Sequence, residues 1–448
     1  MFSLRNSYIE MLKSDSAIER RQAAYILHEY DSLPVRKALL QSLTDPDPMV
    51  KVEVINSLVW LREKNAKTEI KSLLNDPSSM VRNAASTAIG ALGDDSDADS
   101  LLSLVRDPDE KVAISAVIAL GMIGDSYKIV ESLSSLLEST HSVEIIKAVL
   151  TTISKRGNLQ YVLAFTKAEE PTVRSLAFSL LDPTSSKDAF QALLVGVSDS
   201  SGDVRYAALS SLSKIKNDQV LLRLLRAASD ESPLVRRRVA ELLSDFPLDE
   251  VASKLSHLLS DVDPGVRRTT ALSLGKLKDE QAVAQLAEAI KVETVLSTKC
   301  DMVNALSRIG SKNVVNVLES LCHAPEPGVR IIALRGLVAY GYEDIGRLAV
   351  EIANNDPDDW ARGQAAAVIA SVYHEGSIDI LRGVISSGQW TAKVAVAEAI
   401  KDLLTYDGLE LLKDLSKEAH PQVRSTAYDT MGYFRSPSAE KYLLVGLR

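Results

Sequence analysis

The sequence predicts an all-α protein, built as a solenoid of about fourteen antiparallel helix pairs. The first observation is a signature, an aliphatic residue followed by Arg or Lys, that returns every 30 to 32 residues. The second is that a small and an aliphatic residue follow it four and eight positions on, at helical spacing. The third is that turn-forming residues precede it and no segment alternates like a strand. A fixed period in this range is the mark of stacked repeats.

The signature divides the chain into units. We call the first residue of each signature pair its marker; clear copies are Val81, Val204, Val235 and Val266, each followed by Arg. The markers lie at 19, 50, 81, 112, 143, 173, 204, 235, 266, 298, 329, 361, 392 and 423. Because the spacing is unbroken, we expect one continuous solenoid over residues 1–448 rather than several domains.

Residues 220–243 illustrate one unit. Apolar residues recur at helical spacing over 220–228 and again over 235–243, which predicts two helices. Residues 229–233 between them are turn formers that end in a proline. A connection this short makes the two helices antiparallel neighbours. One pair cannot bury its apolar stripe alone, so neighbouring pairs must stack.

Some units depart from the pattern. Residues 141–157 carry Glu144 in the basic position and Lys147 in the small-residue position, and residues 293–310 have Thr298 as their marker. Such units reflect either sequence drift in a tolerant repeat, or a local function: a change in the curvature of the superhelix or an interaction with a partner. A last helix at 437–448 has no partner helix, and we expect it to cap the core.

The polar residues of the signature are expected to be architectural, because a catalytic residue is needed only once. The Asp of each turn, as in Asp76, Asp230 and Asp261, can accept backbone N–H bonds at the start of the second helix. The Arg can pair with an Asp of the same or the adjacent unit and form a ladder. Glycines near predicted helix ends, Gly90, Gly93, Gly121, Gly124 and Gly275, are expected to terminate helices.

The pattern D-x-x-x-x-V-R-x-x-A followed by a leucine resembles the HEAT repeats, which belong to the armadillo-like helical solenoids. Its compact 31-residue form resembles the subclass named after phycobilisome lyases, and the resemblance covers nearly the whole chain. It implies a right-handed α-α superhelix. It also implies that the helix before each turn lies on the convex side, while the helix after it lines a concave binding surface.

Composition excludes several classes of protein. The formal net charge of −9 argues against a broad basic surface that coats nucleic acid. No run of 18 apolar residues is present, so we expect no membrane span, and the N-terminus does not resemble a secretory signal. Cys300 and Cys322 form no C-x-x-C pair and are expected to pack in a reducing, cytoplasmic compartment. A monomer is the favoured oligomeric state.

Candidate metal sites are weak. Asp95, Asp97 and Asp99 match positions of a calcium-binding EF-hand loop, but Ser100 and Arg106 stand where that loop needs Gly and Glu.

The two His-Glu pairs, His28-Glu29 and His374-Glu375, are similar to the iron-binding pairs of deoxyhypusine hydroxylase, a HEAT-repeat enzyme, but they lie eleven repeats apart. The phosphate-binding, nucleophile-elbow and zinc-binding motifs are missing from the sequence. We therefore expect no catalytic residue, cofactor or metal site, and only the family resemblance leaves a lyase activity open.

Positions two, three, six and ten after the marker should point outward from the second helix of each unit. Those positions supply the candidate partner-binding residues Tyr25, Asn56, Trp60, Tyr206, Arg237, Arg238, Arg268, Lys276, Arg308 and Arg335. The run Arg236–Arg238 favours an acidic peptide or protein tail, although residues 222–278 hold ten basic and eight acidic residues. The arginines could equally be a solvated face.

These observations favour a non-enzymatic scaffold or adaptor that binds a protein or peptide along the concave face. The resemblance implies an alternative, a phycobilin-lyase-like or chaperone-like factor for a tetrapyrrole-bearing protein. A third hypothesis is nucleic-acid binding through the arginine cluster, which is similar to the HEAT-like DNA glycosylases.

Overall fold

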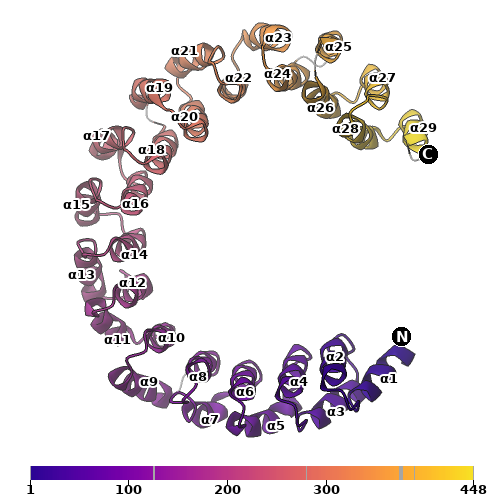
Figure 1. Cartoon of the computed structure of the whole chain (residues 1–448). Helices are drawn as coiled ribbons and strands as arrows, with labels where there is room; N and C mark the ends of the chain where they lie inside the picture. Colours follow the sequence, from indigo (N-terminus) through magenta and orange to yellow (C-terminus); the bar gives the residue numbers. More distant parts are fainter. Residues whose placement is uncertain (1, 125–126, 279, 373–376, 388, 447–448) are drawn as a thin grey trace. The chain divides into compact units, whose positions relative to one another are not determined.

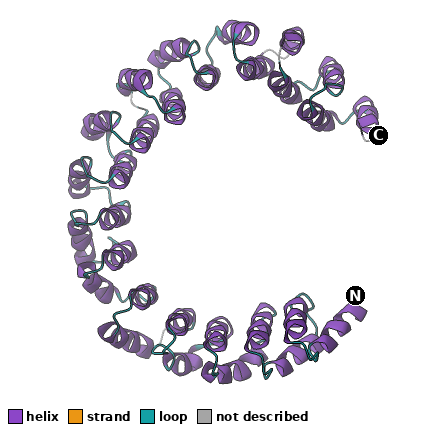
Figure 2. Cartoon of the chain, viewed as in Figure 1, coloured by secondary structure: helices purple, strands orange, loops and turns teal. Residues whose placement is uncertain are grey.

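The computed structural model describes residues 2–124, 127–278, 280–372, 377–387 and 389–446. Over these residues the chain is helical and contains no strand, which confirms the all-α solenoid (Figure 2). It divides into two compact units, Met1–Ile215 (unit 1) and Lys216–Arg448 (unit 2), and each is described by itself. The continuity of one solenoid over the full chain stays a prediction.

The helices of unit 1 are α1 (Phe2–Met11), α2 (Ala17–Leu27), α3 (Leu33–Ser42), α4 (Pro48–Trp60), α5 (Lys67–Ser72), α6 (Ser79–Leu92), α7 (Ala98–Leu102), α8 (Glu110–Met122), α9 (Tyr127–Ser139), α10 (Val143–Ser154), α11 (Leu159–Ala164), α12 (Pro171–Leu180), α13 (Lys187–Gly196) and α14 (Gly202–Leu212). Short 3-10 helices extend some of them: η1 (Lys64–Ala66), η2 (Leu73–Asn75), η3 (Asp95–Asp97) and η4 (Phe165–Lys167).

The helices of unit 2 are α15 (Asp218–Ala227), α16 (Pro233–Leu243), α17 (Leu248–Leu258), α18 (Pro264–Leu277), α19 (Ala282–Val292), α20 (Leu296–Ile309), α21 (Lys312–Leu321), α22 (Pro327–Tyr340), α23 (Ile345–Asn355), α24 (Asp359–Val372), α25 (Ser377–Ser387), α26 (Trp390–Ala399), α27 (Tyr406–Leu415), α28 (Pro421–Met431) and α29 (Pro437–Gly446), with η5 (Ile400–Asp402) and η6 (Gly432–Phe434).

Each odd-numbered helix up to α27 is followed, through a short turn, by its even-numbered partner. Within each unit the odd-numbered helices form one layer and the even-numbered helices the other (Figure 1). The example predicted from the sequence is α15 and α16, and Pro233 begins the second helix, where its missing N–H has no cost. The unpaired α29 packs on α28, and its role as a cap stays a prediction.

The even-numbered helices bury the same positions in nearly every repeat. In α4 the buried residues are Val50, Val54, Ile55, Ser57 and Leu58, which are the marker and positions four, five, seven and eight after it. The predicted core positions four and eight are therefore confirmed. This stripe is wide enough to contact both the odd-numbered partner and the next even-numbered helix.

Three of the predicted helix-terminating glycines lie inside helices instead. Gly90 and Gly275 lie within α6 and α18 and face the next even-numbered helix, and Gly121 lies within α8 in the same way. A Cβ on Gly90 would come within 2.9 Å of the Cα of Ala119, and one on Gly275 within 2.7 Å of the carbonyl oxygen of Ala305. The helix-terminator prediction is wrong for these residues, because they allow close backbone approach.

The register of α10 also differs from the sequence prediction. Its buried residues run from Val149 to Ile153, which are positions four to eight after Ile145 rather than after Val143. The hydroxyl of Thr152 donates to the carbonyl of Val117 at 3.3 Å. In regular units the residue seven after the marker makes this bond, as Ser57 does to Ala24 at 2.8 Å and Ser211 does to Phe178 at 2.9 Å. The marker of this unit is therefore Ile145.

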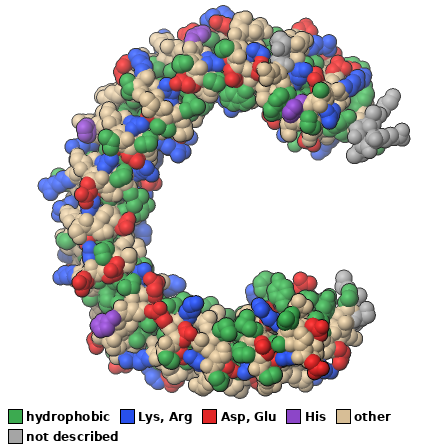
Figure 3. All heavy atoms as spheres, in the orientation of Figure 1, with side chains coloured by type: hydrophobic (Ala, Val, Ile, Leu, Met, Phe, Trp, Pro, Cys, Tyr) green, Lys and Arg blue, Asp and Glu red, His purple; other side chains and the backbone are tan. Residues whose placement is uncertain are grey.

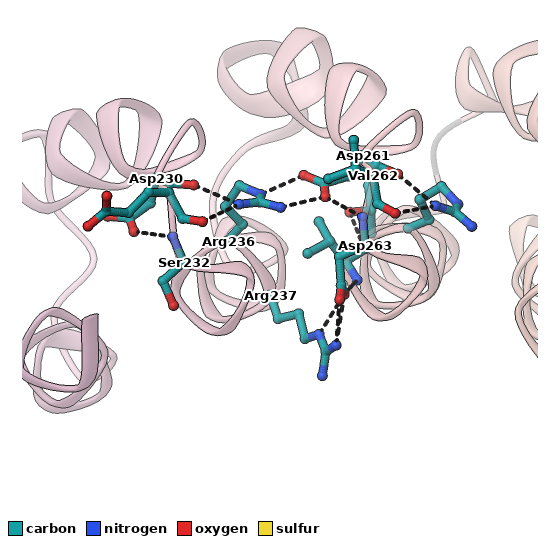
Figure 4. Close-up of polar contacts among 11 residues, drawn as sticks. Asp230, Ser232, Arg236, Arg237, Asp261, Val262 and Asp263 are labelled. Atoms are coloured by element: carbon teal, nitrogen blue, oxygen red, sulfur yellow. Dashed lines mark hydrogen bonds and ion pairs between the residues drawn. The ribbon is translucent and has the colours of Figure 1, made fainter. Parts of the chain in front are cut away.

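In many repeats an arginine or lysine ties the turn to the turn of the next unit, as Arg236 does (Figure 4). Arg236 makes two hydrogen bonds to the carboxylate of Asp261, at 2.6 and 2.7 Å. Its third nitrogen donates to the backbone carbonyls of Asp230 and Glu231 in its own turn, at 2.7 and 3.1 Å. Asp261 in turn accepts the backbone N–H of Asp263 at 2.9 Å. One guanidinium thus satisfies polar groups of two successive turns.

The same link recurs along both units, so the predicted ladder is confirmed and joins adjacent repeats. Its pairs are Arg20–Asp45, Lys51–Asp76, Arg82–Asp107, Arg174–Asp199, Arg236–Asp261, Arg267–Glu293, Lys299–Glu326, Arg330–Asp356 and Lys393–Glu418.

The turn aspartates accept a backbone N–H at the start of the second helix, as predicted, and that N–H belongs to the N-cap residue itself. Asp263, two residues after Asp261, is the N-cap of α18 and accepts the N–H of Val266 at 2.9 Å.

The ladder cations set the protonation of their carboxylates. Burial raises the pKa of Asp261, but the hydrogen bonds from Arg236 and from the N–H of Asp263 outweigh it and bring the pKa below its ordinary value. For Asp107 the hydrogen bond from Arg82 is the largest effect, and the pKa is also lowered.

We expect Arg330→Met to destabilise unit 2 strongly. Arg330 and Asp356 are 8% and 2% exposed, so the substitution leaves a buried carboxylate without its cation, at a cost of about 3–5 kcal/mol. Hydrogen exchange of the α22 and α24 amides measures this cost. The control is Arg347→Met, because Arg347 is 62% exposed and lies 3.8 Å from Glu319; it should cost under about 1 kcal/mol. Equal effects of the two variants would show that the ladder adds no stability.

Acid should unfold the protein through these carboxylates. A group whose pKa is lower in the folded than in the unfolded state stabilises the fold above its unfolded pKa, and this stability is lost as the pH falls through the folded pKa. The urea midpoint should hold down to about pH 5 and fall from about pH 4 downward. The Asp261→Asn variant should have a lower urea midpoint than the native chain near neutral pH, and its midpoint should fall less as the pH is lowered. A loss equal to that of the native chain would contradict the assignment.

Candidate functional site

The positions expected to point outward do so at six and ten residues after the marker. Tyr25, Asn56 and Arg335 at the former position and Lys276 and Arg308 at the latter are exposed. At the earlier positions exposure varies, and Tyr206 is only half-exposed. The solvent face of the even-numbered helices is therefore a surface on which a partner could meet side chains from successive repeats.

In unit 1 three aromatic rings meet on this face. Tyr25 on α2 and Trp60 at the end of α4 are 58% and 72% exposed. The His28 ring lies between them, with centroid distances of 5.1 Å to Tyr25 and 5.3 Å to Trp60, both edge-to-face. The structure thus gives His28 of the first His-Glu pair an aromatic packing role.

A pocket of about 400 Å³ lies between α4 and α6 beside these rings. It is lined by Asn56, Val59, Trp60, Arg62, Ala84, Thr87 and Ala88. The small side chains of Ala84 and Ala88 leave the space that Trp60 borders. Two of the sequence-predicted residues, Asn56 and Trp60, are therefore brought together in one concave site.

Apolar side chains continue this surface as far as α8. Ile118 and Met122 are 52% and 61% exposed, and the Met122 sulfur lies against Gly90 of α6. We call Tyr25, His28, Trp60, Ile118 and Met122 the apolar strip. Hydrophobic side chains gather over α2 and α4 on this face (Figure 3). Large exposed apolar side chains at equivalent positions of several repeats are typical of an interaction site.

The sequence prediction missed Ile118 and Met122, although the signal was present. They occupy the same positions of the fourth unit, six and ten after Val112, as Asn56 and Trp60 occupy after Val50. His28 and Arg62 were missed because they follow the end of a helix. Beyond a helix end, the spacing of apolar residues does not indicate which way a side chain points.

The basic candidates lie in unit 2, and carboxylates of the same unit hold four of them. Their ion pairs are Arg237–Asp263 at 2.8 Å, Arg238–Glu241 at 2.7 Å, Arg268–Asp301 at 2.6 Å and Lys276–Asp245 at 2.6 Å. Lys276, by its hydrogen bond, lowers the pKa of Asp245 despite partial burial. Arg335 binds the side chain of Gln364. Charge here is largely balanced within the surface.

The candidate calcium loop has a structural role. Asp97 is buried; it accepts the N–H of Asp94 at 3.1 Å and pairs with Lys67 and Lys71, each at 3.1 Å. His374 and Glu375 lie outside the described residues. Among the described residues, no three His, Cys, Asp or Glu side chains are placed to hold a metal ion. Burial raises the pKa of the Cys322 thiol to about 12, so this cysteine is a poor nucleophile.

The comparison with known families decides the assignment. A model of the HEAT repeats matches residues 7–90, 37–113, 221–299 and 296–370, which together are more than half of the chain. The chain belongs to the HEAT-repeat family. This match confirms the HEAT repeats but does not reach the phycobilisome-lyase-like subclass, which stays a prediction. No curated protein sequence is significantly similar to the chain.

Solved structures share the fold of these HEAT repeats. Importin beta matches 99% of the chain over 68% of its own length, with 14% identity and a TM-score of 0.51. Kap95p, from a structure with RanGDP, matches 99% over 82% of its length, with 10% identity and a TM-score of 0.52. The karyopherin Kap121p bound to the SUMO protease Ulp1p matches 100% over 63% of its length, with 12% identity and a TM-score of 0.53. Identities this low show the fold alone.

None of the HEAT helices in the described residues is both long and apolar enough to cross a membrane.

Trp60 should contribute most of the tryptophan fluorescence that a quencher in solution can reach. It is 72% exposed, whereas Trp360 and Trp390 are 42% and 43% exposed, and Trp390 stacks on His420 at 4.2 Å. Trp60→Phe should therefore remove more acrylamide-quenchable emission than Trp360→Phe or Trp390→Phe. Equal losses from the three variants would show that Trp60 is covered in solution.

Proposed function

We propose that this chain is a non-enzymatic protein-binding scaffold whose main contact surface is the apolar strip of unit 1. The observation that carries the proposal is the exposure of two large aromatic side chains, Tyr25 and Trp60, beside a pocket of about 400 Å³. Tryptophan and tyrosine in such pockets contribute most of the binding free energy at protein interfaces. The strip lies on the face that the sequence analysis expects to be concave.

Burial of the strip supplies the driving force. Each large apolar side chain that a partner removes from water contributes about 1.5–3 kcal/mol, before the cost of association. Four members of the strip, Tyr25, Trp60, Ile118 and Met122, are more than half exposed. The pocket therefore selects which side chain of a partner binds, while the strip supplies apolar surface area that the partner buries.

The basic residues of unit 2 are a weaker source of affinity for an acidic peptide. A partner carboxylate that binds Arg237 or Arg268 must displace Asp263 or Asp301, so one ion pair replaces another. Such an exchange gains little net free energy at exposed sites. An acidic contact in unit 2 would thus tune specificity more than affinity. The tetrapyrrole-factor and nucleic-acid hypotheses have no comparable observation in their favour.

The structural neighbours support the proposal by analogy. Kap121p is seen bound to Ulp1p and to Pho4p, and Kap95p is seen with RanGDP. Those proteins use the same fold to hold other proteins. The analogy concerns the scaffold and leaves the identity of a partner to experiment.

Photo-crosslinking in the source cells tests the surface. A photoreactive amino acid at Ile118, in the strip, should give discrete protein adducts, while one at Tyr127, 80% exposed on the odd-numbered layer, should give few. Adding Trp60→Ala should remove most Ile118 adducts, because truncating a central aromatic anchor costs about 2 kcal/mol or more, roughly thirtyfold in affinity. Adducts that are equal at both positions, or that survive Trp60→Ala, would refute the proposed surface.

A further inference from the structure

One backbone position in the repeat takes the left-handed conformation, and its occupants are unusual. Among the described residues, those with a positive φ all lie twelve positions after a marker. Three of them are glycines, Gly157, Gly310 and Gly341, and the others are Arg62, Lys278, Leu404 and Arg435. Glycine adopts this conformation without strain, whereas a residue with a Cβ does so at a cost in free energy. Four units therefore keep a strained residue where glycine would serve the fold.

Arg62 is held in this conformation from both sides. After α4 its N–H donates to the carbonyl of Val59 at 2.9 Å, and the N–H of Glu63 donates to that of Leu58 at 2.9 Å, the bonds of a Schellman motif. The Glu63 side chain is then fixed by Arg36 at 2.7 Å and by the N–H of Asn65 at 3.0 Å. With φ at 49°, the backbone of Arg62 has no freedom to relax.

This strained arginine is the charged residue that lines the pocket beside Trp60. Its side chain is exposed and shares the pocket with Asn56 and Thr87. A cation after a helix C-terminus interacts favourably with the helix dipole, and that explanation applies equally to Lys278 after α18. Arg62 in addition lines the apolar pocket beside Trp60.

The pocket combines three kinds of recognition. Trp60 borders a space large enough for one aromatic or long aliphatic side chain. Arg62 complements a carboxylate. The exposed amide of Asn56 offers a donor and an acceptor, which match the C=O and N–H of one peptide unit. A helical ligand satisfies its own backbone groups, so the amide favours an extended segment.

We propose that this pocket binds an extended segment of a partner protein that places one large apolar side chain beside Trp60 and a neighbouring carboxylate on Arg62. The neighbouring charges do not oppose this choice, because Glu53 lies 3.6 Å from Arg21 and Glu63 is bound to Arg36. This inference rests on the proposed scaffold function and adds the chemistry of the partner.

Selection from an unbiased library of twelve-residue peptides on the full chain provides the probe. Selected peptides should carry Asp or Glu within about three residues of a large apolar residue, because an extended chain advances about 3.3 Å per residue. Binding should weaken as salt rises. Peptides without an acidic residue, peptides that become helical on binding, or failure to select any peptide would overturn the inference.

Arg62→Gly separates recognition from folding. The variant removes the cation and the backbone strain together, so the thermal midpoint should stay or rise while peptide affinity falls about tenfold or more. The matched control Lys278→Gly relieves the same strain in unit 2 and should leave peptide affinity unchanged. An Asp→Asn or Glu→Gln change in the peptide should weaken binding to the native chain but not to Arg62→Gly. If the change in the peptide weakens binding to the native chain and to Arg62→Gly equally, Arg62 does not bind the carboxylate.

Trp60→Ala distinguishes the two levels of the proposal. Binding that needs Trp60 but not Arg62 would overturn this inference and leave the scaffold surface intact. Binding that needs neither residue would overturn the scaffold surface itself. Selected peptides that match this chain's own sequence, together with self-association in ultracentrifugation, would identify a second copy as the occupant and overturn the inference.

Discussion

The guanidinium–carboxylate link between successive turns is the interaction on which the solenoid depends. A turn between two packed helices leaves backbone carbonyls and N–H groups that neither helix satisfies. In Arg236 one side chain bonds two such carbonyls and reaches the carboxylate of the next unit, which in turn bonds a backbone N–H. The link therefore holds the turns at one spacing. The alignment of exposed positions on successive even-numbered helices follows from that spacing.

The repeat with marker Val112 lacks this link. Ala113 stands in the basic position, so no cation can reach from this turn to the next. The following helix, α10, shifts its register by two residues, and Thr152 keeps the bond to the Val117 carbonyl that the equivalent residue makes in regular units. Arg156 then donates to the carbonyls of Leu120 and Ile123 at 2.6 and 2.7 Å. These bonds from Arg156 join α10 to α8 in the place where the turn lacks the ion pair.

The sequence predicted most of the fold, because the period is a direct trace of stacking. It misplaced the marker at Val143, since this unit has no basic residue directly after its marker to fix the register. It misread Gly90 and Gly275, because helix termination and close packing both require glycine and only the neighbouring helix distinguishes them. Spacing alone predicted that Asn56 and Trp60 point outward, and both are exposed and line one pocket. It could not find that Arg237 and Arg268 are paired, since their partners lie in the next repeat.

A repeat protein contains its own reference for separating architecture from recognition. Gly310, Gly341 and Arg62 share one backbone conformation at one position of the unit, so the fold requires the conformation but not the arginine. A side chain that costs stability at such a position must be explained by what it contacts. For Lys278 the end of α18 supplies an explanation, because the helix dipole favours a cation there. For Arg62 the same dipole is present, and the residue also lines an apolar pocket with a tryptophan wall. The pocket therefore supplies a reason for the charge of Arg62 in addition to the end of the helix.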